Sequence, residues 1–301
     1  MRFKEVEFKG LWTALITPFN CDLKVDYKSL ELLLNRQIEA SVNGITLLGT
    51  TAETPTLSND ERKEILKFSK EVIGDKVPTM VGVGSYSTAT TIENAKIAEE
   101  LGADSLLVVT PFYNKPTQTG IIKHFEAITN TTNLPICVYN IQGRTGVNIE
   151  TTTLAKIAEI DSIVGVKESS GDLGQVSDVI DSIQNTQNNF SVLSGDDALS
   201  LPLMALGGKG LVSVASNVFP KELKQLVSLC ESANFKDARS LYFKLKEVFS
   251  VLFIETNPAP TKLVLNKLNI KVGSLRLPLC EVSDESAVKI SEVIDNFLAK
   301  Q

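Results

Sequence analysis

The chain is poor in the residues that most often build metal and redox sites. His124 is its only histidine, and that residue falls within a predicted helix, so we exclude a histidine-based catalytic triad and a metal site with several histidine ligands. The four cysteines lie far apart, and none belongs to a Cys-x-x-Cys pair. In a chain of 301 residues this spacing predicts reduced thiols in the cytoplasm, rather than a disulfide framework or a zinc site.

The sequence also lacks a membrane-spanning run, a secretory signal peptide and an excess of positive charge. No apolar run reaches the roughly 18 residues that a membrane-spanning helix needs. The first nine residues alternate charged with apolar side chains and lack the apolar centre of a secretory signal peptide. The formal net charge is −6, which disfavours nucleic acid and anionic membranes as main partners. With 43% hydrophobic and 22% charged residues, the composition is that of a globular enzyme.

What the sequence does contain is a repeated unit, in which a short apolar run is followed by a polar loop and a helical pattern. Eight apolar runs, interpreted as strands, lie at Leu11–Ile16, Gly44–Leu48, Thr79–Val83, Ser105–Val109, Pro135–Tyr139, Ile163–Lys167, Phe190–Leu193 and Gly210–Val214. Strands that alternate with helices indicate a parallel sheet with crossover helices. Eight units over roughly 230 residues fit a closed (β/α)₈ TIM barrel better than an open doubly wound sheet.

The end of the chain departs from this repeat. Residues 234–301 read as two or three helices, interrupted by Asn257-Pro258-Ala259-Pro260 and by Leu277-Pro278. We therefore expect residues 1–233 to form a barrel that carries the active site, and residues 234–301 to form a helical appendage packed on it.

Lys167 stands at the end of the sixth apolar run, before Ser169-Ser170-Gly171 turns the chain. A lysine at the mouth of an apolar barrel is partly desolvated, and desolvation favours the neutral amine that can attack a carbonyl group. The alternative is a lysine that ends a strand and extends into solvent.

Other reactive side chains fall at the same end of the predicted barrel, where (β/α)₈ enzymes have their active sites. Hydroxyl groups from three strand ends beside a lysine would be able to carry protons around a Schiff base. Taken singly, the threonines could cap turns and Tyr139 could be a core aromatic residue. The residues at these strand ends are Thr50, Thr51, Phe112, Tyr113, Tyr139, Arg144, Lys167, Ser194 and Gly195.

Five motifs in order give the chain a family resemblance. Gly-Thr-Thr-Ala-Glu (49–53), Thr-Pro-Phe-Tyr-Asn (110–114), the segment from Tyr139 to Gly146, Gly-Val-Lys-Glu-Ser-Ser-Gly (165–171) and Leu-Ser-Gly-Asp-Asp (193–197) resemble the dihydrodipicolinate synthase and N-acetylneuraminate lyase family. These proteins are class I aldolases that form a Schiff base with pyruvate. The resemblance covers nearly the whole chain, including the C-terminal Asn-Pro-x-Pro.

The resemblance implies a role for each matching residue. Lys167 would form the Schiff base, with Tyr139 as the adjacent proton donor and acceptor. Thr50 and Tyr113 would complete the proton relay, Tyr113 acting across a subunit interface of a homotetramer. The pyruvate site would also include Thr51, Gly195 and Val212, with no metal or organic cofactor.

Arg144 separates the branches of this family. The family's synthases carry an arginine here that binds the carboxylate of L-aspartate 4-semialdehyde, and the sugar-acid lyases generally lack it. The resemblance therefore implies condensation of pyruvate with that semialdehyde on the diaminopimelate route to lysine. The alternatives are a lyase acting on N-acetylneuraminate or a 2-keto-3-deoxy sugar acid, and a non-catalytic pyruvate-binding sensor.

Some positions depart from the family pattern. Gln142 stands where family members commonly have proline, so the direction in which the loop points Arg144 is left open. Ala52 stands where they more commonly have glycine, which is free to adopt positive φ. In lysine-inhibited members a glutamate binds the inhibitor's amino group, and Thr90 stands at that position, so we expect weak or absent inhibition by lysine.

Two other clusters have simpler interpretations. We expect a turn at Gly207–Gly210 rather than a phosphate site, and a helix N-cap at Asp196-Asp197 rather than a metal site.

Overall fold

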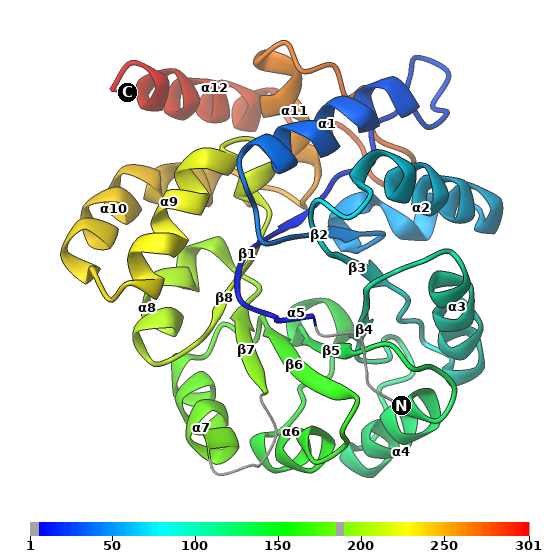
Figure 1. Cartoon of the computed structure of the whole chain (residues 1–301). Helices are drawn as coiled ribbons and strands as arrows, with labels where there is room; N and C mark the ends of the chain where they lie inside the picture. Colours follow the sequence, from blue (N-terminus) through cyan, green and yellow to red (C-terminus); the bar gives the residue numbers. More distant parts are fainter. Residues whose placement is uncertain (1–5, 185–189, 301) are drawn as a thin grey trace.

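The computed structural model describes residues 6–184 and 190–300, and its centre is a closed barrel of eight parallel strands (Figure 1). Each strand pairs with its neighbours in sequence, and β1 closes the barrel by pairing with β8. This confirms the predicted TIM-barrel fold. The strands are β1 (Gly10–Ala14), β2 (Gly44–Leu47), β3 (Thr79–Gly82), β4 (Ser105–Val109), β5 (Ile136–Asn140), β6 (Ile163–Glu168), β7 (Ser191–Ser194) and β8 (Gly210–Ser213).

The helices surround this barrel, as Figure 1 shows. Local sequence signals set several of their ends; for example, Ser58 and Glu61 form a capping box at the start of α2. The helices of the barrel are α1 (Tyr27–Glu39), α2 (Asn59–Ile73), α3 (Thr88–Glu100), α4 (Gln118–Thr129), α5 (Gln142–Thr145), α6 (Thr151–Ala158), α7 (Leu173–Gln184), α8 (Ser200–Ala205) and α9 (Pro220–Glu231). Short 3₁₀ helices are η1 (Thr50–Ala52), η2 (Thr54–Thr56), η3 (Asp197–Leu199) and η4 (Ala215–Asn217).

The core has two layers, which explains why the strands read as continuous apolar runs. Side chains on the outer side of the strands pack against the helices, and Leu11 and Ile45 are examples. Inward-facing side chains fill the barrel with a smaller cluster, which contains Trp12, Met80, Leu107, Leu193 and Val212. The barrel is therefore a packed core, and its reactive groups must lie at its ends.

The C-terminal helices pack against the helices of the barrel. They are α10 (Phe235–Val251), α11 (Ala259–Lys267) and α12 (Asp284–Leu298). Helix α10 contacts α8, α9 and α12, while α11 contacts η4 and α12. The placement of a domain boundary between residues 233 and 234 stays a prediction. Within residues 6–184 and 190–300, no helix is both long and apolar enough to cross a membrane.

Candidate active site

Lys167 and Tyr139 lie side by side at the carboxyl ends of β6 and β5. The two residues are partners in the parallel register, and the Lys167 Nζ atom lies 4.1 Å from the centroid of the Tyr139 ring. Each residue is only 6% exposed. The lysine therefore does not extend into solvent, because its amine is held over the tyrosine ring within the mouth of the barrel.

The floor beneath this pair is apolar. Val212 and Leu193 belong to the same inward-facing cluster as Tyr139, and Val212 is fully buried. Cys137 lies in that cluster too, and burial raises the pKa of its thiol to about 12. The thiol therefore stays neutral at physiological pH and is a poor nucleophile.

Gly195 makes room for the lysine. A Cβ atom at position 195 would lie 2.8 Å from the Cε atom of Lys167 and 1.9 Å from the Oγ atom of Ser169. Both distances are shorter than real Cβ contacts allow. The backbone amide of Gly195 donates a hydrogen bond to the carbonyl of Glu168, at 2.8 Å. A residue without a side chain is therefore needed here because the lysine and its neighbours occupy the space.

Sequence reasoning did not identify the polar contacts that lock the ends of these two strands together. The side-chain amide of Asn140 donates to the carboxylate of Glu168 at 3.1 Å, and the backbone amide of Ser170 donates to the same carboxylate at 2.7 Å. Burial raises the pKa of Glu168. These contacts fix Asn140 and Glu168, the residues that directly follow Tyr139 and Lys167, but periodicity in the sequence gives no sign of them.

A second group of predicted residues lies around η1. Thr51 is 4% exposed, and its Oγ atom accepts a hydrogen bond of 2.9 Å from the side-chain amide of Asn257. The backbone carbonyl of Asn257 accepts a longer contact, 3.5 Å, from the Nη2 atom of Arg144 in α5. One residue of the C-terminal segment thus joins Thr51 to Arg144. Thr50 begins the same 3₁₀ turn, and its carbonyl accepts from the amide of Glu53 at 3.1 Å.

Tyr113 is placed differently from the rest. Its side chain is 92% exposed, and its backbone adopts a positive φ of 69°. The nearby Phe112 packs edge-on against Tyr86, with ring centroids 5.7 Å apart. The single chain therefore presents Tyr113 outward, whereas it encloses Lys167 and Tyr139.

The two departures from the family pattern cause no local strain. After β2, positive φ angles are found at Leu48 and Glu53, both 54°, whereas Ala52 lies within the 3₁₀ turn η1. Gln142 begins α5, where a proline would also fit, because the first residue of a helix needs no amide donor.

The two aspartates after β7 have different roles. Asp196 caps η3, since its side chain accepts from the amide of Ala198, and this confirms the predicted cap. Asp197 is instead buried and accepts from the amides of Val214 and Ala215, so it holds the loop after β8; burial raises its pKa to about 6.

The predicted turn is found at Gly207, which has a φ of 113°. Across residues 6–184 and 190–300, no three His, Cys, Asp or Glu side chains are placed to hold a metal ion.

Known proteins match this chain over nearly its full length. It is 48% identical to a 4-hydroxy-tetrahydrodipicolinate synthase of Protochlamydia amoebophila, with 96% of each chain covered, and 43% identical to one of Methanocaldococcus jannaschii, with 97% of this chain and 98% of that protein covered. A solved structure of the synthase from Methylacidiphilum fumariolicum has a TM-score of 0.95 and 40% identity, with 98% of this chain and 97% of that chain covered. The sequence model described as the dihydrodipicolinate synthetase family matches residues 7–297. The chain therefore belongs to the dihydrodipicolinate synthetase family.

Proposed function

We propose that this protein is a 4-hydroxy-tetrahydrodipicolinate synthase, which condenses pyruvate with L-aspartate 4-semialdehyde through a Schiff base on Lys167. The observation that carries the proposal is the enclosure of Lys167 over the ring of Tyr139. A 48% identical relative bears the name of this synthase.

The reaction begins at the ketone of pyruvate. The neutral amine of Lys167 attacks the carbonyl carbon, and loss of water gives the imine. Tyr139, Thr50 and the Tyr113 hydroxyl of a neighbouring subunit carry the protons that this dehydration requires. Thr51 binds the carboxylate of pyruvate, while Gly195 and Val212 line the pocket around the methyl group. Loss of a methyl proton then converts the imine to an enamine.

The enamine carbon next attacks the aldehyde carbon of the second substrate. This step forms the new carbon–carbon bond, and the aldehyde oxygen takes up a proton to become a hydroxyl group. Arg144 holds the carboxylate of the semialdehyde. The amine of the semialdehyde then attacks the imine carbon, closes the ring and releases Lys167 as a free amine. No metal or organic cofactor takes part.

The rival reaction is cleavage of N-acetylneuraminate or a 2-keto-3-deoxy sugar acid on the same Schiff base. Arg144 favours the synthase, because a guanidinium matches a carboxylate rather than a sugar hydroxyl chain. A pyruvate sensor without catalytic activity would have no use for the tyrosine that packs against Lys167.

Borohydride reduction tests the proposal. Reduction in the presence of pyruvate should add the pyruvyl mass to the peptide that contains Lys167, and Lys167→Arg should abolish both labelling and turnover. Labelling of another lysine, or of none, would contradict the mechanism. Comparable turnover of N-acetylneuraminate would move the assignment to the lyases.

We further propose that the working form is a homotetramer built from dimers. Tyr113 supports this, since its 92% exposure in the single chain leaves its side chain available to a second subunit. All four cysteines are free thiols, which supports the cytoplasm as the compartment. A fully active monomer in sedimentation would refute the proposed assembly.

A further inference from the structure

The C-terminal segment reaches the loop that follows β2 and makes buried contacts with it. The carboxylate of Glu53 forms an ion pair with Lys262 of α11, with Oε1 and Nζ 2.6 Å apart, and both side chains are at most 2% exposed. The backbone amide of Arg276 donates to the other carboxylate oxygen of Glu53 at 3.0 Å. Buried charges that lose a partner are strongly unfavourable, so this pair ties the loop to the C-terminal segment.

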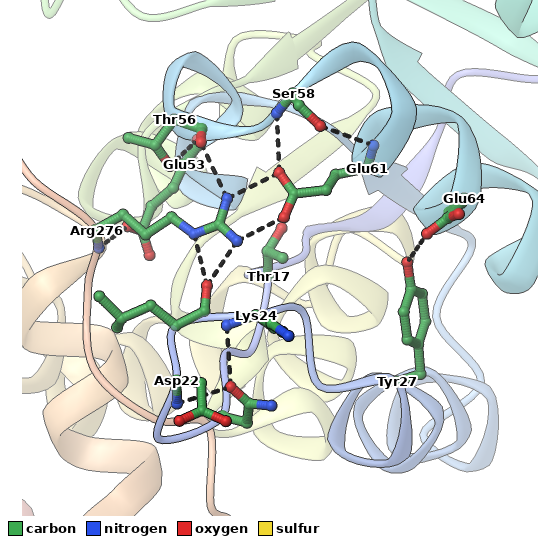
Figure 2. A network of polar contacts seen from close by, with 12 residues as sticks. Thr17, Asp22, Lys24, Tyr27, Glu53, Thr56, Ser58, Glu61, Glu64 and Arg276 are labelled. Carbon is green, nitrogen blue, oxygen red and sulfur yellow. Dashed lines mark hydrogen bonds and ion pairs between the residues drawn. The ribbon is translucent and has the colours of Figure 1, made fainter.

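The side chain of Arg276 strengthens the same connection, as Figure 2 shows. Its guanidinium contacts both carboxylate oxygens of Glu61, at 2.9 and 2.6 Å, and lowers the pKa of that carboxyl to about 2. It also donates to the carbonyl of Thr56, at 3.0 Å. From the other side, the hydroxyl of Thr17 donates to the carbonyl of Ala52, at 2.8 Å. The turn that carries Thr50 and Thr51 is therefore held from both sides.

Within this fixed frame, one contact acts directly on a proposed substrate-binding group. The side-chain amide of Asn257, a residue only 4% exposed, donates to the Oγ atom of Thr51 at 2.9 Å. The other end of this amide is engaged as well, because its Oδ1 atom accepts from the hydroxyl of Thr261 at 3.2 Å. The amide nitrogen therefore faces Thr51, and Thr51 is the acceptor.

A hydroxyl group that accepts a hydrogen bond still has its own proton to donate. We infer that Asn257 is a positioning residue: by donating to Thr51, it directs the Thr51 hydroxyl proton toward the carboxylate of pyruvate. The inference rests on the proposed function and adds to it a residue outside the barrel strands. Asn257 acts through Thr51 and does not itself touch the reacting atoms.

The geometry also predicts which substrate is affected. The contact of Asn257 with Arg144 uses the backbone carbonyl, which any side-chain substitution leaves in place. A change at position 257 should therefore weaken the binding of pyruvate and leave the binding of the semialdehyde nearly unchanged.

Two substitutions at one position test this. In Asn257→Asp the ionised side chain can only accept, so it takes the Thr51 proton and repels the carboxylate of pyruvate. We expect the KM for pyruvate to rise by about 10- to 100-fold, the range for loss of a charge-assisted hydrogen bond. In Asn257→Ala the Thr51 hydroxyl is free to rotate, but no carboxylate competes for its proton. The KM for pyruvate should therefore rise less than in Asn257→Asp. In both variants the KM for the semialdehyde should stay within about twofold of the wild-type value.

Asn266→Asp is the matched control. Asn266 lies in the same segment, and among the described residues its side chain bonds backbone groups, the carbonyl of Gly273 and the amide of Val272. This variant should keep the wild-type KM for pyruvate. Melting temperatures of all three variants would report any general loss of stability, which a purely structural role of Asn257 would produce without a selective change in pyruvate KM.

Imine trapping separates this inference from the function on which it rests. Wild-type protein that forms no borohydride-trapped imine with pyruvate would overturn the proposed function. If the wild type forms the imine and Asn257→Asp traps it with the same dependence on pyruvate concentration, the function stands and the positioning role is wrong. A larger pyruvate KM for Asn257→Ala than for Asn257→Asp would also overturn it.

Discussion

Substitution of Gly195 by alanine should impair the chemistry of Lys167 without unfolding the protein. The added Cβ would lie 1.9 Å from the Oγ atom of Ser169, 2.8 Å from the Cε atom of Lys167 and 3.0 Å from its Cγ atom. Overpacking of a buried site costs about 1–3 kcal/mol, which a barrel of this size should tolerate. The lysine has little room to yield, because its amine already packs over the ring of Tyr139 at 4.1 Å.

The expected loss of activity follows from that displacement. Moving a reacting group by about 1 Å costs roughly 100-fold in rate, so we expect imine formation in Gly195→Ala to slow by about that factor. The assay is the rate of borohydride-trapped adduct at saturating pyruvate, with circular dichroism and melting temperature to check the fold. Gly143→Ala is the control, since a Cβ at that position would have no atom within 4 Å.

A second substitution separates the two clashes. Ser169→Ala removes the atom at 1.9 Å but leaves the contacts with Lys167 at 2.8 and 3.0 Å. The double variant, Gly195→Ala with Ser169→Ala, should therefore recover part of the lost melting temperature but remain slow in imine formation. Imine formation within twofold of wild type in Gly195→Ala would refute the idea that Gly195 sets the position of the lysine.

Other predictions follow from single residues. Arg144→Ala should sharply reduce turnover of the semialdehyde while pyruvate is still trapped on the enzyme, and loss of trapping would contradict its assignment to the second substrate. Burial lowers the pKa of His124 from 6.5 to about 4, so the unfolded chain takes up a proton between these pH values that the folded chain does not. The free energy of unfolding should thus fall by at most about 3 kcal/mol from pH 6.5 to 4, and His124→Gln should flatten this dependence in urea titrations. Half-inhibition by lysine should need millimolar concentrations or more, because Thr90 supplies no carboxylate, and initial rates at subsaturating pyruvate would reveal tighter inhibition.

The fold was predictable because each unit of the barrel has its own local signal, a short apolar run followed by a polar loop and a helical pattern. The sixth apolar run, expected over Ile163–Lys167, became β6 with one further residue, Glu168. A buried carboxylate is unusual in a strand, and Asn140 and Ser170 stabilise Glu168 there by donating hydrogen bonds to it. Strand periodicity thus located the element, while its last residue depended on contacts between two strands.

The same distinction applies to the candidate site. Lys167 and Tyr139 could be predicted to meet because the carboxyl ends of parallel strands converge at one end of a barrel. Asn257 could not be, because its contact with Thr51 spans 206 positions of the chain. In the sequence, Asn257 appeared as part of a proline-rich break between helices and of the Asn-Pro-x-Pro that supports the family resemblance, and neither assigned it a role. A pattern that marks a break gives no information on which residue the side-chain amide will contact.

The buried pair of Glu53 and Lys262 changes how the C-terminal segment should be understood. A carboxylate with 0% exposure needs its partners, and both of them, Lys262 and the amide of Arg276, come from beyond residue 233. A barrel that ended at residue 233 would lack both partners, directly after the turn that holds Thr50 and Thr51. In the whole chain, removal of the Lys262 charge alone would leave a buried carboxylate without a counter-charge, which is strongly destabilising. The C-terminal helices are therefore part of what keeps the β2 loop in place, and an active site confined to the barrel would lack that support.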